Sequence, residues 1–340
     1  MNLADLNKIA VAMVAPGKGI LAADESTGTI KKRFDAIGTE NTEDNRRDYR
    51  ELMFRSTEAM KYISGVILYD ETIWQNAKDG TPLVDLITKA GSIPGIKVDE
   101  GTKPLPQCPG ELITVGLDKL ADRLPKYYER GARFAKWRAV LDIGQGIPSY
   151  TAISTNAHAL ARYAALCQAA QIVPIVEPEV LMDGDHDADQ CYMVTEFMLK
   201  ETFQQLYYQK VALEGIVLKP NMVVPGKKSS KKASVEEVAE KTVKLLKACV
   251  PGAVPGIAFL SGGQSDEEAT AHLDAMNKIR NLPWKLTFSY GRALQAAPQK
   301  AWSGKAENTA AAQRAFTHRA MMNGLASLGE WKQDLEKKAA

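Results

Sequence analysis

The feature of this sequence that most constrains its fold is a repeated unit. In each unit a short apolar run, bounded by Gly or Pro, precedes a longer segment with helical spacing. Successive runs start about 25 to 45 residues apart, which is the size of a strand–helix unit in a parallel sheet. The eight runs are 19–24, 64–70, 95–99, 134–142, 172–179, 215–220, 256–262 and 285–291. The pattern therefore predicts eight parallel strands, each followed by a helix.

The segments between the runs predict the helices. Ser234 and Ser265 are each followed three residues later by a glutamate, which is the pattern of a capping box at a helix N-terminus. The predicted helices are 42–62, 154–170, 187–211, 238–249, 269–279 and 307–327, with a further helix over 1–15 and a C-terminal helical segment over 307–340.

The chain length permits two interpretations of the domain organisation. At about 150 residues per domain, 340 residues would make two domains, but no change of composition divides the chain. An open, doubly wound sheet would usually carry a GxGxxG turn after its first strand, and the turn at 24–29 (Asp-Glu-Ser-Thr-Gly-Thr) lacks that spacing. The sequence therefore favours an α/β fold with one (β/α)8 TIM barrel, a single domain over residues 1–340.

Composition excludes several classes of function. The formal net charge is only +2, which disfavours nucleic acid as a main partner, and the basic run 227–232 is expected to be a solvated loop. No apolar stretch approaches the ~20 residues of a membrane-spanning helix, and the N-terminus has no signal-peptide pattern. We therefore expect no membrane partner and a cytoplasmic location. The cysteines and histidines are dispersed, so we expect reduced cysteines, no metal site and no cofactor: Cys108, Cys167, Cys191, Cys249, His158, His186, His272 and His318.

Polar residues at the ends of the apolar runs are the candidate functional groups. In a barrel the C-terminal strand ends and the following loops form the active face, so these residues would converge there. Lys219 follows three aliphatic residues and precedes a proline. Two interpretations stay open: a lysine whose amine reaches water just past the strand, or a desolvated amine with a lowered pKa that acts as a nucleophile.

Two neighbouring strands carry paired charges. Lys136 and Arg138 are two residues apart, as are Glu177 and Glu179, so each pair lies on one face of its strand. These groups could form a structural ion-pair network. Beside Lys219, they could instead supply acid/base groups and a cation that keeps the lysine neutral, and the conjunction of three strands favours this catalytic interpretation.

A phosphate site is predicted independently after the last two strands. Ser261, Gly262 and Gly263 follow the seventh run, and Ser289, Gly291 and Arg292 end or follow the eighth. Small residues let backbone N–H groups approach an oxyanion, Arg offers a two-pronged contact, and these two loops commonly hold phosphate in barrels. A tight turn without a ligand is the alternative. If Lys97 and Arg138 bind a second anion, the substrate carries two phosphates.

Six long segments together resemble the class I fructose-bisphosphate aldolase family. They occur in the family's order between about Leu21 and Asn323: 21–28 (LAADESTG), 134–138 (FAKWR), 174–179 (PIVEPE), 218–222 (LKPNM), 259–265 (FLSGGQS) and 286–295 (LTFSYGRALQ). The resemblance implies a metal-independent lyase that cleaves fructose 1,6-bisphosphate reversibly, through a lysine Schiff base. The products are dihydroxyacetone phosphate and glyceraldehyde 3-phosphate, in glycolysis and gluconeogenesis.

The resemblance also implies a role for each catalytic candidate. Lys219 would attack the substrate ketone, and Glu177 would move protons during formation of the Schiff base. Lys136 would be the cationic neighbour of Lys219, Glu179 would hold the charge network, and Asp24, alternatively a simple helix N-cap, would be the base near the C4 hydroxyl.

The same resemblance implies two phosphate sites and an oligomer. The residues expected around the ketone-side phosphate are Ser261, Gly262, Gly263, Ser289, Gly291 and Arg292. Those expected around the far phosphate are Ser26, Lys97 and Arg138. Thr29 stands where the family usually has a serine and keeps a hydroxyl for phosphate contact, and Arg33 stands where the family has a further phosphate-contacting arginine. The phosphorylated sugar is the expected partner, and a homotetramer is the expected assembly.

Two further expectations concern departures and rivals. Many family members end in a tyrosine that speeds proton exchange on the enamine, whereas this sequence ends Glu-Lys-Lys-Ala-Ala, so we expect slower enamine protonation.

The rival functions are a Schiff-base aldolase for another phosphorylated ketose and a non-catalytic scaffold on the same frame. The scaffold is disfavoured because Asp24, Lys136, Glu177 and Lys219 are all present.

Overall fold

Eight strands of this protein, described by a computed structural model, close into a barrel in which all neighbouring strands are parallel. The structure describes residues 1–339. Around the barrel the strand order is β1, β10, β9, β8, β7, β6, β3 and β2, and β2 pairs again with β1. The strands are β1 Gly19–Ala23, β2 Ile63–Leu68, β3 Ile93–Lys97, β6 Phe134–Leu141, β7 Val173–Val180, β8 Val217–Leu218, β9 Gly256–Phe259 and β10 Lys285–Tyr290. The prediction of a (β/α)8 barrel is confirmed.

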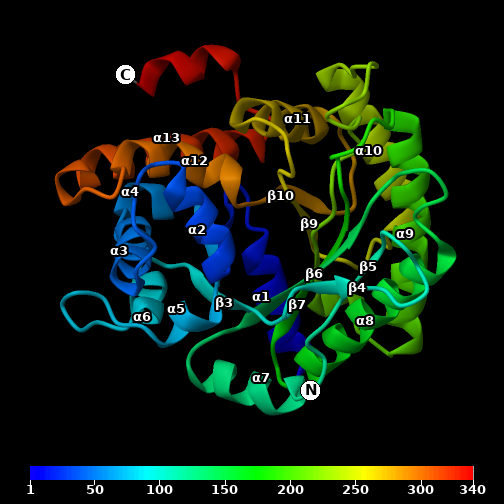
Figure 1. Cartoon of the computed structure of the whole chain (residues 1–340), viewed down its shortest axis with the longest axis horizontal. Coiled ribbons are helices and arrows are strands. Elements are labelled where there is room, and N and C mark those ends of the chain that lie inside the picture. Colours follow the sequence, from blue (N-terminus) through cyan, green and yellow to red (C-terminus); the bar gives the residue numbers. More distant parts are fainter. Residues whose placement is uncertain (340) are drawn as a thin grey trace.

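Helices surround this barrel (Figure 1), with α8 to α11 on one side of the view and α3, α12 and α13 on the other. The helices are α1 Leu3–Met13, α2 Thr27–Asp35, α3 Glu43–Phe54, α4 Thr57–Met60, α5 Asp70–Trp74, α6 Leu83–Lys89, α7 Leu120–Glu129, α8 Tyr150–Ala169, α9 Ala188–Tyr208, α10 Val235–Cys249, α11 Asp266–Lys278, α12 Arg292–Trp302 and α13 Thr309–Ala326. Short 3-10 turns are η1 Leu213–Gly215, η2 Ala306–Asn308 and η3 Gln333–Ala339. A small hairpin, β4 Thr102–Pro104 and β5 Leu112–Thr114, extends from the loop after β3.

The hydrophobic core has two layers, and together they explain where the site lies. The larger cluster fills the space between strands and outer helices, and includes Trp137 of β6 and Val176 of β7. The smaller cluster fills the N-terminal end of the barrel, where Leu6 of α1 packs with interior residues such as Phe134 and Ile175. Successive strand residues face opposite sides, so the next interior position lies two residues further along each strand. After Phe134 and Ile175 of the smaller cluster these positions are Lys136 and Glu177, which are polar. The open end of the barrel is therefore the C-terminal one.

Several predicted boundaries are wrong. The helix predicted over 42–62 is two helices, because the chain leaves helical geometry at Ser56, the N-cap of α4. A helix between the eighth strand and the last predicted helix was not expected. It is α12, which begins at Arg292 directly after β10. The predicted segment 307–340 is not continuous: α13 ends at Ala326, Gly329 turns the chain with φ of +72°, and η3 follows. Ala340 lies outside the described residues.

The capping prediction is correct in full at one site and in part at the other. Ser265 accepts a hydrogen bond from the Glu268 N–H, and the Glu268 side chain accepts one from the Ser265 N–H. At Ser234 the side chain accepts a hydrogen bond from the Glu237 N–H, but the return bond to the Ser234 N–H is not formed within residues 1–339.

All four cysteines are free thiols, and Cys167 and Cys191 are buried. No helix in the described part of the chain combines the length and apolarity needed to cross a membrane.

Candidate active site

A cavity of about 240 Å³ opens at the C-terminal end of the barrel. Its lining comes from seven of the eight barrel strands or the loops that follow them, so it depends on barrel closure. It includes every predicted site residue except Gly263: Asp24, Ser26, Thr29, Arg33, Lys97, Lys136, Arg138, Glu177, Glu179, Lys219, Ser261, Gly262, Ser289, Gly291 and Arg292. Gly263 lines a smaller neighbouring cavity of about 80 Å³.

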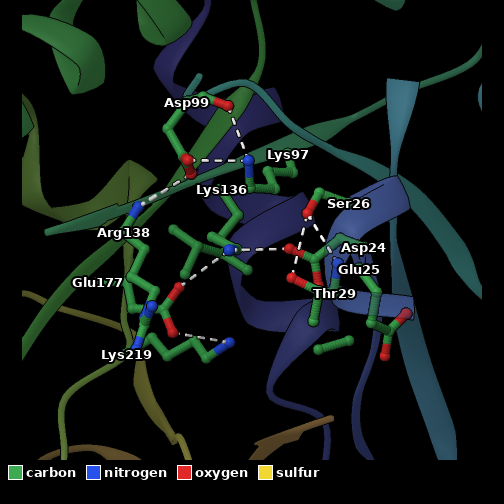
Figure 2. Close-up of polar contacts among 12 residues, drawn as sticks. Asp24, Glu25, Ser26, Thr29, Lys97, Asp99, Lys136, Arg138, Glu177 and Lys219 are labelled. Carbon is green, nitrogen blue, oxygen red and sulfur yellow. Dashed lines mark hydrogen bonds and ion pairs between the residues drawn. The ribbon is translucent and has the colours of Figure 1, made fainter. Parts of the chain in front are cut away.

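A chain of ion pairs crosses the floor of this cavity (Figure 2). Lys219 Nζ lies 3.1 Å from Glu177 Oε1, and Glu177 Oε2 lies 3.4 Å from Lys136 Nζ. Lys136 Nζ lies 2.8 Å from Asp24 Oδ2. Glu177 and Lys136 belong to β7 and β6, whereas Lys219 and Asp24 directly follow β8 and β1. At most 11 % of each side chain is exposed. Two ammonium groups and two carboxylates thus alternate across the barrel.

Lys219 is held in the interior, and it does not extend to water. It follows directly after β8, its backbone N–H donates to Val176 O at 2.8 Å, and only 4 % of the residue is exposed. The alternative in which its amine reaches solvent is therefore excluded by the fold. A buried ammonium needs a compensating charge, which Glu177 supplies.

The ion pairs shift the acidity of two groups strongly. Burial by itself would raise the pKa of Asp24, but the charges of Lys136 and Lys219 outweigh burial and lower that pKa to about 2. Burial would likewise lower the pKa of Lys136, but Asp24, Glu177 and Asp99 outweigh it and raise that pKa above its usual range. Asp24 is therefore a carboxylate and Lys136 an ammonium at neutral pH.

A second set of charges lies on the side of the cavity formed by β3 and β6. Arg138 Nε donates to Glu179 Oε2 at 2.5 Å, which fixes the guanidinium at the rim. Lys97 Nζ lies 2.9 Å from Asp99 Oδ1 and donates to the Asp99 carbonyl at 2.8 Å. Asp99 also accepts a hydrogen bond from the Arg138 N–H at 3.3 Å (Figure 2). Asp99, which follows β3, therefore binds the Lys97 ammonium and also links β3 to β6 through the Arg138 N–H.

Ser26 and Thr29 line a neighbouring cavity together with these two cations. Ser26 is the N-cap of α2, where its Oγ accepts from Thr29 N–H at 3.4 Å and lies 3.1 Å from Thr29 Oγ1. Asp24, which precedes the loop, is not the N-cap. The simple N-cap interpretation of Asp24 is therefore wrong, because Ser26 fills that role.

The loops after β9 and β10 form a separate, anion-seeking end of the cavity. Gly291 is the N-cap of α12 and supplies no side-chain cap, so the first N–H groups of that helix stay available to an anion. Ser289 Oγ is buried and has no hydrogen-bond partner within residues 1–339. Arg292 donates to the Gly262 carbonyl across the gap between the two loops. The arrangement offers N–H, hydroxyl and guanidinium donors to one oxyanion.

Arg33 approaches the same end from α2. A Cβ built on Gly291 would lie 3.7 Å from Arg33 Nη2, so the guanidinium faces the Gly291 loop. Arg33 is paired with Glu25, a buried carboxylate that also accepts from Gln295 Nε2 at 2.8 Å. The resemblance implies a phosphate contact for Arg33 without specifying which phosphate, and its guanidinium lies at the ketone-side loops.

Two supporting residues of the site, Asp99 and Glu25, are not among those that the sequence predicts. Each stands beside a predicted site residue, and each binds one of the predicted cations, Lys97 or Arg33. The signal that could have found them is charge balance, because cations held in a partly buried cavity need carboxylate partners. Among the described residues, no group of three or more His, Cys, Asp or Glu side chains is arranged to hold a metal ion.

Comparisons with known proteins place this geometry in context. The family model described as "Fructose-bisphosphate aldolase class-I" matches residues 5–340. A probable fructose-bisphosphate aldolase class 1 from Xanthomonas campestris is 59 % identical over 333 residues, which is 98 % of this chain and 100 % of the relative. A cytosolic fructose-bisphosphate aldolase of Arabidopsis thaliana is 56 % identical over 94 % of this chain and 82 % of its own. A solved structure of the Plasmodium falciparum aldolase superposes with a TM-score of 0.96 at 49 % identity, covering 97 % of this chain and 96 % of that one.

Proposed function

This chain belongs to the class I fructose-bisphosphate aldolase family, and from that premise we propose how its own residues carry out the reaction. The reaction is the reversible cleavage of fructose 1,6-bisphosphate through a lysine Schiff base, a step of glycolysis. The single observation that supports our assignment of residues is the alternating chain Lys219–Glu177–Lys136–Asp24 in the cavity.

Lys219 is the proposed nucleophile. After its ammonium has passed a proton to Glu177, the amine attacks the C2 carbonyl of the ketose. The carbonyl oxygen takes up a proton, and the resulting carbinolamine loses water to leave an iminium ion. Glu177 is the proposed proton carrier for these steps, because its Oε1 already lies 3.1 Å from Lys219 Nζ. The iminium then withdraws electrons from the C3–C4 bond.

Asp24 is the proposed base for bond cleavage. It takes the proton of the C4 hydroxyl as the C3–C4 bond breaks, so that glyceraldehyde 3-phosphate leaves and the bonding electrons pass into an enamine on Lys219. The pKa of about 2 keeps Asp24 ionised and able to accept this proton. Lys136 is the proposed cation that orients both carboxylates, since it lies between Asp24 and Glu177. Protonation of the enamine and hydrolysis of the Schiff base release dihydroxyacetone phosphate.

The two ends of the cavity are the proposed phosphate sites. The ketone-side phosphate would be bound by Ser261, Gly262, Ser289, Gly291 and Arg292, with Arg33 beside them. The far phosphate would be bound by Lys97, Ser26, Thr29 and Arg138, with Glu179 holding the arginine in place. The substrate would then span the barrel mouth with its carbonyl above Lys219.

Borohydride reduction in the presence of dihydroxyacetone phosphate tests the assignment. Reduction should trap one equivalent of stable adduct, and peptide mapping should place it on Lys219. The variant Lys219→Arg should trap none while remaining folded. An adduct on another lysine would overturn the mechanism, and activity that is lost with a metal chelator would overturn its metal independence.

We propose three further properties: the domain organisation, the assembly and the location. We propose that residues 1–340 form one domain, because strands from both ends of the chain pair in one barrel. We propose a homotetramer with the phosphorylated sugar as ligand, and the exposed Tyr150, Met193 and Phe197 on α8 and α9 offer apolar contact surface. We propose a cytoplasmic location, in keeping with two relatives named cytosolic. Light scattering of the purified protein tests the tetramer.

A further inference from the structure

The basic run 227–232 is only partly the solvated loop that its composition predicts. Lys228 is exposed, and the exposed side chain of Lys231 pairs with Asp187 on the surface. Lys227 differs, because the fold brings it against the loop after β9. It lines the cavity of about 80 Å³ beside Ser261, Gly262, Gly263 and Arg292.

The Lys227 side chain crosses Gly263 at van der Waals contact. A Cβ built on Gly263 would overlap Lys227 Cε and would lie 2.5 Å from Nζ, so any larger residue would displace the end of the lysine from this position. The backbone on both sides is fixed, since Lys227 N–H donates to Met182 O at 2.7 Å and Gly263 N–H donates to Met182 Sδ at 3.0 Å. The ammonium is thereby held at the outer edge of the ketone-side phosphate loop.

The pairing of Lys227 is weak enough to be exchanged. Its Nζ lies 2.8 Å from Asp183 Oδ1, but the side chains are 42 % and 61 % exposed. Exposed pairs of this kind contribute only about 0 to 1 kcal/mol. A phosphate dianion offers more charge and more acceptor oxygens than one solvated carboxylate.

The charges around this small cavity favour an incoming anion. Three cations line it, Arg138, Lys227 and Arg292, against two carboxylates, Glu179 and Asp183. Arg138 is already bound to Glu179 at 2.5 Å, and Arg292 is bound to a carbonyl, Gly262 O. Lys227 differs from both arginines. Among the described residues its only ion pair is with Asp183, a largely exposed carboxylate.

We propose that Lys227 is a further ligand for the ketone-side phosphate, which it reaches by leaving Asp183 when substrate occupies the Gly262–Gly263 loop. This inference rests on the phosphate site proposed above. It also gives a reason for Gly263, which does not line the main cavity: a side chain at that position would block the lysine.

Steady-state kinetics of Lys227→Met test the proposal. Methionine reaches as far as the Cε that contacts Gly263 but lacks the ammonium group. We expect KM for fructose 1,6-bisphosphate and the inhibition constant of inorganic phosphate each to rise about fivefold, with kcat within about twofold of the wild type, since the lost contact is a partly exposed charge pair. The matched control is Lys228→Met, which should change neither constant. Equal constants for the two variants would overturn the proposal.

Asp183→Asn separates a ligand role from a structural one. If Lys227 binds phosphate, freeing it from Asp183 should leave KM unchanged or lower it. If Lys227 matters only because it ties Asp183 in place, Asp183→Asn should raise KM as much as Lys227→Met does, and the proposal is then wrong. Thermal unfolding of each variant shows whether the fold is intact.

Arg292→Ala distinguishes failure of this inference from failure of the proposed site. If Arg292→Ala raises KM and the phosphate inhibition constant while Lys227→Met does not, only the role of Lys227 is refuted. If neither variant changes either constant, the ketone-side phosphate site itself is misplaced, and the inference falls with it.

Discussion

Glu177 Oε1 lies 3.1 Å from Lys219 Nζ, at the ends of the neighbouring strands β7 and β8. The other oxygen of the same carboxylate faces Lys136 at 3.4 Å. One buried carboxylate therefore serves two ammonium groups, and a proton passing to or from Lys219 has Glu177 as its immediate neighbour.

Glu177→Gln should reduce turnover without destroying substrate binding. The amide keeps the shape of the side chain but cannot carry a proton, so we expect kcat to fall about 10²- to 10³-fold and KM to change little. Steady-state kinetics and the rate of borohydride trapping measure this. Glu196→Gln on α9, where the carboxylate pairs with exposed Lys200, is the control and should behave as wild type. A kcat within tenfold of wild type would rule out Glu177 as the proton carrier.

Asp24 should make the stability of the protein depend on pH in the acidic range. Its pKa falls from 3.8 to about 2 on folding. A carboxyl with a lowered folded-state pKa stabilises fully above its unfolded pKa, and this contribution is lost as pH falls toward the folded value. The shift corresponds to about 2 kcal/mol, of which about 1 kcal/mol is lost by pH 3.

Urea unfolding of wild type and Asp24→Asn measures this contribution. The difference between their unfolding free energies should be largest near pH 6 and should shrink by about 1 kcal/mol at pH 3. A difference that stays constant with pH would show that Asp24 is not ionised by its lysine neighbours in the way the ion pairs imply.

Lys97 should govern the preference between bisphosphate and monophosphate ketoses. It lies at the end of the cavity away from the Gly291 loop, so it should contact only the far phosphate. We expect Lys97→Met to raise KM for fructose 1,6-bisphosphate about tenfold, through loss of a charge-assisted contact, and to leave KM for fructose 1-phosphate nearly unchanged. Equal changes for both substrates would refute this placement of the far phosphate.

Gly95 should be required for packing at the closed end of the barrel. A Cβ at this position in β3 would overlap the ring of Phe134, which fills the barrel interior. We expect Gly95→Ala to lower the free energy of unfolding by about 2 to 3 kcal/mol because the buried ring has little room to move.

Gly28→Ala is the matched control for this effect. Gly28 lies in α2 with no atom within 4 Å of its would-be Cβ, so alanine should stabilise the helix by up to about 1 kcal/mol. Chemical denaturation of both variants gives the comparison. A Gly95→Ala protein as stable as Gly28→Ala would show that Phe134 can repack.

Much of the fold was predictable because strand patterning is local. Phe134, Lys136 and Arg138 alternate with Ala135 and Trp137, and the structure places the first set inside the barrel and the second against the outer helices. The helix α12 was missed because its start, Gly291–Arg292, was interpreted as part of a phosphate turn. The segment Gly291–Arg292 is both the predicted phosphate turn and the N-terminus of α12.

The supporting residues of the site were not predictable in the same way. The sequence predicts Asp99 as the last residue of a strand, and nothing beside it in the sequence indicates that it contacts both Lys97 and the Arg138 N–H. Lys227 was one of four lysines in a short basic run, and only its position across Gly263 separates it from Lys228.

The side chains that face the barrel interior, and the chemistry that they bring, can be predicted from the sequence, because the two-residue period of a strand and the identity of a side chain are local properties. The position of Glu177 between Lys136 and Lys219 depends on the folded structure. The same is true of Arg33 facing the Gly291 loop and of Lys227 crossing the loop at Gly263. The reason is that closure of the barrel determines which strand ends become neighbours and which side chains can reach one another. The distance between two residues along the chain indicates neither of these.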